Sequence, residues 1–550
     1  MRGKTKRFAA VLVGGAALVL AACGGGSSSS SGGDEGEPVY GGTITVGLEA
    51  ESTGLRPWED SCASPCSNMM NTIYDTLTAN TKDEGYKPYL AESVTASADL
   101  TEWTVKLRSG VTFHNGVELT AQTLVDMYPI QEQGTAAGSA IKSAGVTGIT
   151  KVDDLTVTYT LKAPYAGFEA DLSGSSLGRV FEPAAAAADP AGYSLKPIGT
   201  GPFKIESRDV DNETVVVKYE NYWGKDQDGN QLPYLDKIIF KPTPDEQQRL
   251  TALVSGTVDA FQTLRQGTIR DARASDGLKL TEFQGNNTGG GMFNTQVPPL
   301  DDKRVRVALN MANNQEAVIN ALGGTGISAE ATQWFSPDSP WYSEKARDSY
   351  PKYDIAAATA MLQEYIDDPA RSDGKKPGDK IYVELNCPPD PTLVAAMQVV
   401  SAGWKETGLV DVRLGGKDQS AHINDAVGDK HAAHCWRWGG QGDPQAGIQA
   451  FFAASADSVA NFTNFDDPAI ATKAKAAGEN PDFAARKAVY EELMILINEE
   501  GLLWYSGHTA TAIVSKPNVN GFLSWTSPDG SAGIGIPDAV VNWAFVWVGQ

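Results

Sequence analysis

Two short motifs carry residue types that serve as nucleophiles or bases in hydrolytic enzymes. Residues 174–178 read Gly-Ser-Ser-Leu-Gly, which fits the Gly-x-Ser-x-Gly pattern of a nucleophilic serine at Ser176. That pattern needs a buried strand before it, and residues 167–171 do not read as one. His114 lies in Phe-His-Asn-Gly, a sequence typical of a tight turn with a locally hydrogen-bonded imidazole. No nucleophile is paired with a carboxylate, so the sequence predicts a protein without catalytic activity.

A third motif, His431-Ala-Ala-His434-Cys435, contains possible metal ligands. Imidazole and thiolate are common ligands of zinc. Two histidines alone are a weak metal site, however, and Cys435 is better used in a disulfide with Cys387. We therefore expect neither a bound metal nor another cofactor.

The N-terminus predicts export and a lipid anchor. Four basic residues precede an apolar stretch from Phe8 to Leu20, which is too short to span a membrane but suits a signal peptide. The following Ala-Ala-Cys23 resembles the bacterial lipobox, in which the cysteine thiol receives a diacylglycerol. We predict a lipoprotein signal peptide at 1–22, a flexible Gly/Ser tether at 23–38, and a location on the extracytoplasmic face of the cell membrane.

Composition and cysteine usage agree with an exported globular protein. The 550 residues can form two or more packed lobes, and 41% are hydrophobic. The net charge of −23 argues against nucleic acid as a partner, because nucleic acid needs clustered Lys and Arg. With Cys23 set aside, four cysteines remain, and the simplest pairing is Cys62 with Cys66 and Cys387 with Cys435.

Strand-like and helix-like patterns alternate along the chain, which indicates a mixed α/β fold. Residues 43–46 read as a first strand, and residues 155–161 alternate apolar and polar positions like a half-buried strand. Thr243-Pro-Asp-Glu246 has the form of a capping box with proline at the first helical position. Residues 481–498 predict an amphipathic helix that buries Leu493, Leu496 and Ile497.

A series of ordered segments resembles the extracytoplasmic solute-binding proteins of peptide-type ABC importers. The most specific match is Gly-Val-Thr-Phe-His-Asn-Gly at 110–116, between a strand and a helix start. Further matches occur at 90–93, 103–108, 119–121, 197–203, 221–224, 255–260 and 302–309.

The resemblance implies an α/β fold of two lobes joined by a hinge, with the ligand enclosed between them. An extra subdomain is inserted in the first lobe. For this chain it implies a first lobe at 39–290 plus 505–550, an inserted subdomain at about 60–190, and a second lobe at 291–504.

In peptide-binding relatives, a Trp-containing stretch that ends near Asp-Pro lines the ligand cavity, and an acidic residue after the Trp pairs with the peptide α-ammonium. The resemblance assigns this role to residues 436–444. Here the acidic position falls on Gly440 or Gln441, neither of them charged, and Asp443 is displaced toward the Asp-Pro element. The candidate ligand-binding residues are Arg56, Trp58, Asn294, Trp334, Trp436, Arg437, Trp438, Gln441 and Asp443.

The expected function is capture of an extracellular solute and its delivery to an ABC permease powered by a separate ATPase subunit. We expect a monomer. The ligand is a short peptide or another oligomeric solute. Twelve tryptophans would also suit stacking on sugar rings, so an oligosaccharide is a rival ligand. A ligand sensor and a lipid-anchored hydrolase are the alternative functions.

Overall fold

The structure is a computed structural model that describes residues 36–549, except 53, 61, 83–84, 175, 338, 418, 440–442, 456–457 and 459. The predicted signal peptide, Cys23, most of the predicted tether and Gln441 lie outside the described residues. Residues 38–550 form one compact unit, and the fold below is that of this unit. No helix of the described residues combines the length and apolar character that a membrane crossing requires.

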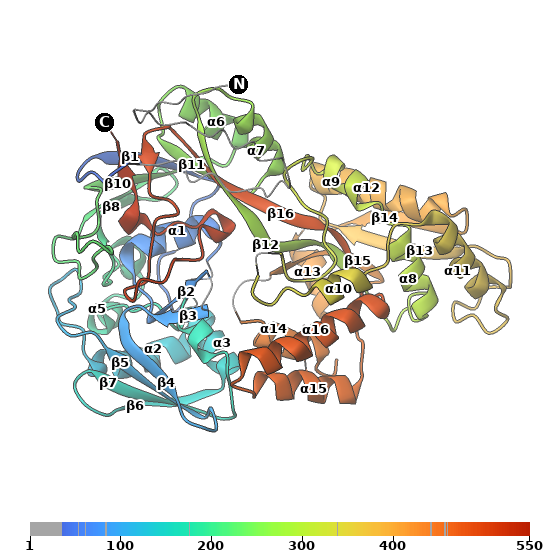
Figure 1. Ribbon diagram of the computed structural model, residues 1–550, viewed down its shortest axis with the longest axis horizontal. Helices are drawn as coiled ribbons and strands as arrows, with labels where there is room; N and C mark the ends of the chain where they lie inside the picture. Colours follow the sequence, from blue (N-terminus) through green and yellow to red (C-terminus); the bar gives the residue numbers. More distant parts are fainter. Residues whose placement is uncertain are drawn as a thin grey trace, which may run out of the picture. The chain divides into compact units, whose positions relative to one another are not determined.

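A ten-stranded mixed sheet runs through both halves of the unit (Figure 1). Its strand order is β14-β13-β15-β12-β16-β11-β1-β10-β9-β8. The bounds are β1 Thr43–Leu48, β8 Phe203–Asp209, β9 Glu213–Lys218, β10 Lys237–Pro242, β11 Ala260–Thr263, β12 Lys279–Phe293, β13 Ile381–Cys387, β14 Val410–Gly416, β15 Ala433–Gly439 and β16 Leu503–Ser515.

The two longest strands, β12 and β16, connect the lobes. They pair with each other antiparallel over most of their length. At one end β16 pairs with β11 of the first lobe, and at the other end β12 pairs with β15 of the second. Two adjacent strands that run from one lobe into the other can act as a hinge.

The first lobe packs around one hydrophobic core. Ile44 and Val46 of β1 point into it, as do Phe240 of β10 and Ile513 of β16. Val541, close to the C-terminus, belongs to the same core, so the chain returns to the first lobe at its end. The helices of this part are α1 Ser64–Ile73, α6 Glu246–Val254 and α7 Gln266–Arg273, with short strands β17 Val519–Asn520 and β18 Trp547–Val548.

A separate four-stranded antiparallel sheet is inserted within the first lobe. Its order is β4-β5-β7-β6, and it is drawn in blue and cyan in Figure 1. The insert comprises β2 Thr78–Thr81, β3 Gly85–Pro88, β4 Ala91–Ala96, β5 Glu102–Leu107, α2 Ala121–Gln133, α3 Thr135–Ala144, β6 Val146–Lys151, β7 Thr156–Leu161, α4 Phe168–Asp171 and α5 Pro183–Ala188. The exact lobe boundaries expected from the sequence stay a prediction.

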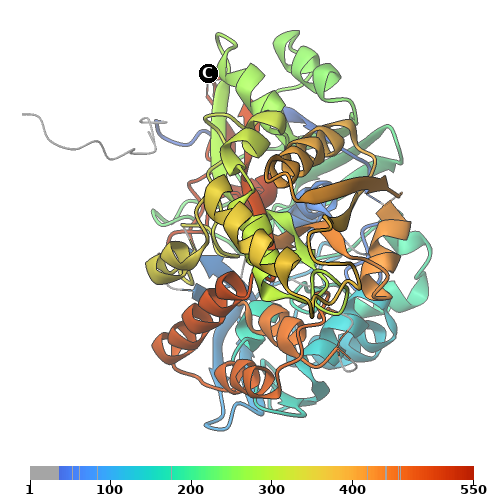
Figure 2. The same cartoon turned by 90° about the vertical axis from the view of Figure 1, so that its right-hand side faces the viewer.

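The second lobe has helices on both faces of its part of the sheet, and Figure 2 looks onto this lobe. Successive residues of β16 alternate between two cores: Trp504 enters one, and Leu503 and Tyr505 enter the other. The first core is covered by α8 Lys303–Met311, α9 Gln315–Ala321, α11 Ile355–Asp367 and α12 Pro391–Glu406. The second is covered by α10 Glu344–Ser349, α13 Gln419–Val427, α14 Gln445–Phe452, α15 Pro468–Gly478 and α16 Phe483–Glu499.

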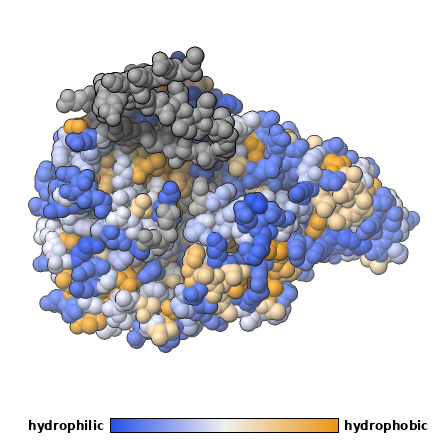
Figure 3. Space-filling view, in the orientation of Figure 1, coloured by the Kyte–Doolittle hydropathy of each residue, from blue (hydrophilic) through white to orange (hydrophobic). Residues whose placement is uncertain are grey.

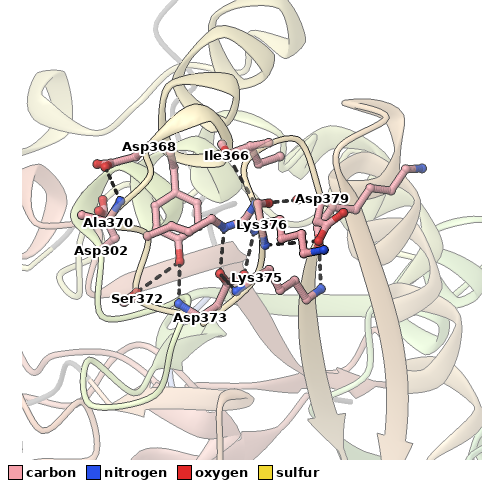
Figure 4. A network of polar contacts seen from close by, with 12 residues as sticks. Asp302, Ile366, Asp368, Ala370, Ser372, Asp373, Lys375, Lys376 and Asp379 are labelled. Atoms are coloured by element: carbon pink, nitrogen blue, oxygen red, sulfur yellow. Dashed lines mark hydrogen bonds and ion pairs between the residues drawn. The ribbon is translucent and has the colours of Figure 1, made fainter.

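The loop between α11 and β13 contains a network of polar contacts around a buried arginine, Arg371, and Figure 4 shows its partners Asp373, Lys376 and Asp379. Arg371 pairs with both oxygens of Asp373 at 2.7 Å and donates to the carbonyls of Lys376 and Asp379. Tyr365 of α11 is hydrogen-bonded to Ser372 at 3.1 Å.

Most predicted local elements are present, and one helix start was wrong. The predicted strands at 43–46 and 155–161 correspond to β1 and β7. The helix predicted to begin at the Thr243 capping box begins instead at Glu246, because Oδ1 of Asp245 caps it by accepting from the Gln248 amide at 2.8 Å. In α16, Leu493 and Ile497 are buried as predicted, whereas Leu496 is half-buried.

Both predicted disulfides are present. Cys62–Cys66 closes a short loop at the start of α1, and Cys387–Cys435 joins β13 to β15. The Cα atoms of each pair are 5.2 Å apart.

Candidate ligand-binding site

A cavity of about 460 Å³ lies where the first lobe meets the second. Most of its wall comes from the first lobe: α1 and the segment after it, the β2–β3 hairpin, α4 and the C-terminal loop. Asp443, just before α14, is contributed by the second lobe. The lining residues are Asn71, Tyr74, Asp75, Thr76, Ala79, Asn80, Tyr86, Tyr89, Ala170, Asp171, Ser173, Gly174, Pro202, Asp443, Trp525, Ile534, Gly535, Pro537, Val540 and Asn542.

Asp75, two residues after α1, is a carboxylate buried in the cavity wall, with 4% of the residue exposed. Nε1 of Trp223 donates to one of its oxygens at 2.8 Å, and the Tyr222 hydroxyl donates to the other at 3.1 Å. Burial raises the pKa of Asp75 to about 7, and these hydrogen bonds only partly oppose the shift. The cavity therefore contains an acid that titrates near neutral pH.

Asp171, at the end of α4, is a second such acid. Burial raises its pKa to about 7; a hydrogen bond from Tyr165 lowers it, and the negative charge of Asp443 raises it further. Asp171 belongs to the first lobe and Asp443 to the second, so this repulsion acts across the lobe interface.

Asp443 itself is paired within its own lobe. Its carboxylate forms a buried ion pair with Arg486 of α16, and Oδ1 also accepts from the Gln445 amide at 2.9 Å at the start of α14. Arg486 in addition lies over the ring of Trp341, 5.1 Å from its centroid. This network holds Asp443 in a fixed position at the cavity wall.

Direct hydrogen bonds join the two lobes beside the cavity. The Gly167 amide donates to Oε1 of Gln445 at 2.9 Å, and the Ala166 amide donates to the carbonyl of Gly478 at 3.1 Å. Tyr86 of the hairpin contacts the Asp443 backbone. The cavity thus lies next to a contact that forms only when the lobes are together.

Comparison with known proteins decides the family. The model for bacterial extracellular solute-binding proteins, family 5 (middle part), matches residues 85–458. The chain belongs to this family.

The relatives of this solute-binding protein agree with the assignment. The dipeptide-binding protein of Escherichia coli is 25% identical over 465 residues, 79% of this chain and 83% of the relative. The nickel-binding periplasmic protein of the same organism is 26% identical over 458 residues, 81% and 86% of the two chains. The crystal structure of the ABC transporter substrate-binding protein CtaP from Listeria monocytogenes shares the fold, with a TM-score of 0.77 at 20% identity, covering 93% of this chain and 100% of that chain.

Among the predicted ligand-binding residues that the structure describes, Asp443 lines the cavity. Arg56, in the loop after β1, is held by both oxygens of Asp60, with Nη2 2.7 Å from Oδ1. Trp58 packs in the first-lobe core against Phe181 and Tyr193. Ligand roles for Arg56 and Trp58 stay predictions.

Two predicted tryptophans of the second lobe come together. Trp334 stacks on Trp438 with ring centroids 5.2 Å apart, although the two are far apart in sequence, and both are buried. Trp436, two residues earlier on β15, is half-buried and packs on Phe462. Asn294 is buried and donates to the carbonyl of His431. Their ligand roles also stay predictions.

Arg437 points away from these tryptophans, as strand alternation requires, and is exposed. Burial raises the pKa of the Glu49 carboxyl, and the charges of Arg249, Arg265 and Arg437 lower it. A ligand role for Arg437 stays a prediction.

The histidines of the Phe-His-Asn-Gly and His-Ala-Ala-His-Cys motifs form hydrogen bonds with backbone groups. Nε2 of His114 hydrogen-bonds to the Gly201 carbonyl at 3.0 Å, and Nδ1 accepts from the Gly199 amide. Nε2 of His431 pairs with the Phe462 carbonyl, and Nε2 of His434 with that of His422. In the described part of the chain, no three His, Cys, Asp or Glu side chains are grouped to hold a metal ion.

Sequence reasoning missed the first-lobe side of the cavity. Asp75, Asp171 and the pair Tyr86 and Tyr89 come from three separate segments and meet only in the folded lobe. The sequence offers one signal of these lining residues: several of them lie close to apolar segments that form the core.

Proposed function

We propose that this protein is the lipid-anchored solute-binding component of an ABC importer. It captures a small extracellular solute, with a short peptide as the best-supported class, and delivers it to a membrane permease that a separate ATPase subunit powers. It acts as a monomer, without catalysis of its own.

The observation that carries this proposal is the cavity at the lobe interface. Its wall combines residues of both lobes, and the contact of Gly167 with Gln445 lies beside it. A ligand bound there touches both lobes and therefore favours the state in which they are together. The family membership and the dipeptide-binding relative support a peptide as the ligand.

Strands β12 and β16 allow the two lobes to move relative to each other. β12 and β16 join the lobes through two adjacent segments, so the lobes can rotate while each keeps its own core. A permease that binds the closed lobes would then distinguish the loaded protein from the empty one.

Ligand capture can be tested with the purified protein. Native mass spectrometry identifies a solute retained through purification, and a thermal-shift screen compares short peptides with oligosaccharides. A ligand at about 100 times its Kd should stabilise the protein by about 2.7 kcal/mol. Stabilisation by peptides supports the proposal. No stabilisation by any solute, together with turnover of an ester or glycoside, would overturn it.

The anchor has its own test, based on Cys23. Cells fed an alkyne fatty acid should label the wild-type protein and keep it in the membrane fraction. Cys23→Ser should be unlabelled and found in the soluble fraction, whereas a tether variant, Ser30→Ala, should behave as wild type. Labelling of Cys23→Ser would contradict the assignment of the anchor.

A further inference from the structure

We propose that three buried histidines of the second lobe, His422, His431 and His434, form an acid-sensitive switch. In the neutral state this histidine cluster holds α13 and the loop at 461–464 against β15, and protonation of its rings lets α13 detach. The inference goes beyond solute capture, because it makes the packing of one part of the second lobe depend on pH.

The three imidazole rings pack on one another. The rings of His422, from α13, and His434, from β15, stack nearly parallel with centroids 3.8 Å apart, and the His431 ring lies 4.9 Å from that of His434. The neighbours from β12 and from the loop at 461–464 are uncharged: Met292 pairs with His434 in the sheet, and the loop reads Asn-Phe-Thr-Asn. The face of the molecule in Figure 3 shows many hydrophilic residues, whereas these rings lie in the interior, with 0–3% of each residue exposed. A charge on one ring would therefore have little water around it and would repel a charge on the next.

Hydrogen bonds to backbone carbonyls define which nitrogen of each ring carries the hydrogen. Nε2 of His422 lies 2.9 Å from the Cys435 carbonyl, and Nε2 of His434 lies 3.1 Å from the His422 carbonyl, so both nitrogens donate. Nε2 of His431 donates in the same way to the Phe462 carbonyl at 2.8 Å. In a neutral ring Nδ1 then carries no hydrogen. The Nδ1 atoms of His422 and His434 are buried and have no hydrogen-bond partner among the described residues, so an added proton would find no acceptor there.

The charged groups near the histidine cluster come from α13 and from the turn before β15. Asp425 of α13 is ion-paired with Lys417, and Asp429 of the turn accepts a hydrogen bond from Asn464 at 3.0 Å. Lys430 follows in the same turn and acts on Asp425. The two carboxylates favour a charged ring, but each of them already has a partner.

Burial outweighs these carboxylates. It lowers the pKa of all three histidines, that of His434 to about 3, and the neighbouring rings lower the pKa of His434 further. Asp425 raises the pKa of His422 and of His434, and Asp429 raises that of His431, which the backbone of Asp425 also raises. The closed packing therefore keeps these rings neutral at mildly acid pH.

The direction of the pH effect follows from this difference between the packed and the detached state. When α13 detaches, the rings meet water and titrate near their ordinary pKa of about 6.5. Below that pH the detached state binds protons that the packed state does not bind. The stabilising contribution of the histidine cluster is therefore complete above about pH 6.5 and is lost progressively as the pH falls.

The histidine cluster lies beside a strand that leads to the cavity. The His422 ring lies over that of Trp436 of β15, with centroids 6.1 Å apart, and Trp436 packs on Phe462. β15 ends at Gly439, shortly before Asp443 in the cavity wall. We expect detachment of α13 to loosen this segment and to lower the retention of a solute. This consequence, unlike the switch itself, rests on the proposed function.

Hydrogen–deuterium exchange of the wild-type chain at pH 7.5 and pH 5.5 measures the opening of α13, once the intrinsic exchange rate at each pH is taken into account. At pH 5.5 a free imidazole is protonated about ten times more often than it is neutral, so each ring kept neutral by packing favours opening about tenfold. The opening constant of α13 should rise at least about tenfold, whereas that of α11, which contains no histidine, should change less than about twofold. No rise in α13, or an equal rise in α11, would overturn the switch.

His434→Gln tests the histidine cluster itself, because a glutamine amide can still donate to the His422 carbonyl but gains no proton. The acid-induced rise in the opening of α13 should be about tenfold smaller than in wild type. The matched control is His114→Gln in the first lobe, where Nε2 of His114 also lies beside a backbone carbonyl, and it should keep the wild-type response. A wild-type response in His434→Gln would overturn the role of His434. The comparison of wild type at two pH values does not depend on how this variant folds.

Native mass spectrometry at the same two pH values measures the consequence for the cavity. The fraction of protein that carries retained solute should fall at pH 5.5 in wild type and should fall less in His434→Gln. Equal loss in both proteins, or no loss in either, would overturn the link between the histidine cluster and the cavity. Absence of retained solute already at pH 7.5 would contradict solute capture, whereas the exchange result tests the switch without any solute.

Discussion

The Gly167 amide of the first lobe donates to Oε1 of Gln445 in the second, 2.9 Å away. This hydrogen bond and the neighbouring one from Ala166 to Gly478 hold an insert segment of the first lobe against α14 and α15. The cavity, with Asp171 and Asp443 in its wall, lies beside this contact. The contact between the lobes and the cavity are therefore adjacent.

Widening this contact should weaken ligand binding. A Cβ on Gly167 would lie 3.2 Å from Oε1 of Gln445 and 3.3 Å from Cγ of Asp443, so we expect the larger side chain of Gly167→Val to displace these side chains and widen the contact. We expect an increased radius of gyration by small-angle scattering and about tenfold or greater loss of affinity for the retained solute, equivalent to about 1.4 kcal/mol. Gly148→Val serves as control, because a Cβ at Gly148 would have no other atom within 4 Å. An unchanged radius and affinity in Gly167→Val would show that the contact does not limit closure.

Asp75 should make stability fall as the pH rises. Its folded pKa of about 7 lies above its ordinary value of 3.8, so between these values the folded state binds a proton that the unfolded state has lost. This stabilising contribution is complete below about pH 4 and is lost as the pH rises through 7. Urea unfolding of Asp75→Asn from pH 4 to 8 should show a flatter profile than wild type. Parallel profiles would mean that Asp75 is ionised throughout this range.

The two disulfides should differ in their effect on stability. Their cysteines are 48 and 4 residues apart, and the entropy removed from the unfolded chain grows with loop length. Cys387→Ser/Cys435→Ser should lower the free energy of unfolding by about 4 kcal/mol, and Cys62→Ser/Cys66→Ser by about 2 kcal/mol. Chemical denaturation of both double variants measures the difference. The reverse order would indicate that native-state contacts, not loop entropy, dominate.

Two residues of β15, Trp438 and Arg437, should contribute very differently to the free energy of unfolding. Trp438 is buried against Trp334, so Trp438→Ala should lower the free energy of unfolding by about 3–5 kcal/mol. Arg437 is exposed, and Arg437→Ala should change stability by less than about 0.5 kcal/mol. Tryptophan fluorescence during denaturation measures both. A small effect of Trp438→Ala would argue that its ring is available to a solute.

Local sequence patterns predicted much of the fold but little of the cavity. Strand β1 and helix α16 follow from periodicity alone, and the cysteine pairs from their number and spacing. The start of α6, observed at Glu246, was predicted too early because Thr243 and Asp245 could each cap the helix. Only the folded backbone selects Asp245.

The residues of the cavity could not be predicted from local patterns, because they are distant from one another in sequence. Asp443 was predicted from its segment, but its partner Arg486 and its opposing acid Asp171 come from other elements. The pairing of Trp334 with Trp438 likewise needs β15 and a loop of the second lobe to pack together. Such convergence depends on tertiary packing, which periodicity and spacing do not encode.

Filling the cavity tests most directly whether it is the site of solute capture. Ala170 lines the cavity, so Ala170→Trp should occupy its volume, whereas Ala187→Trp places the same side chain on the exposed face of α5. Native mass spectrometry then measures the fraction of purified protein that carries retained solute. We predict that wild type and Ala187→Trp retain the solute and that Ala170→Trp does not. Equal retention by a correctly folded Ala170→Trp variant would contradict the placement of the ligand in this cavity.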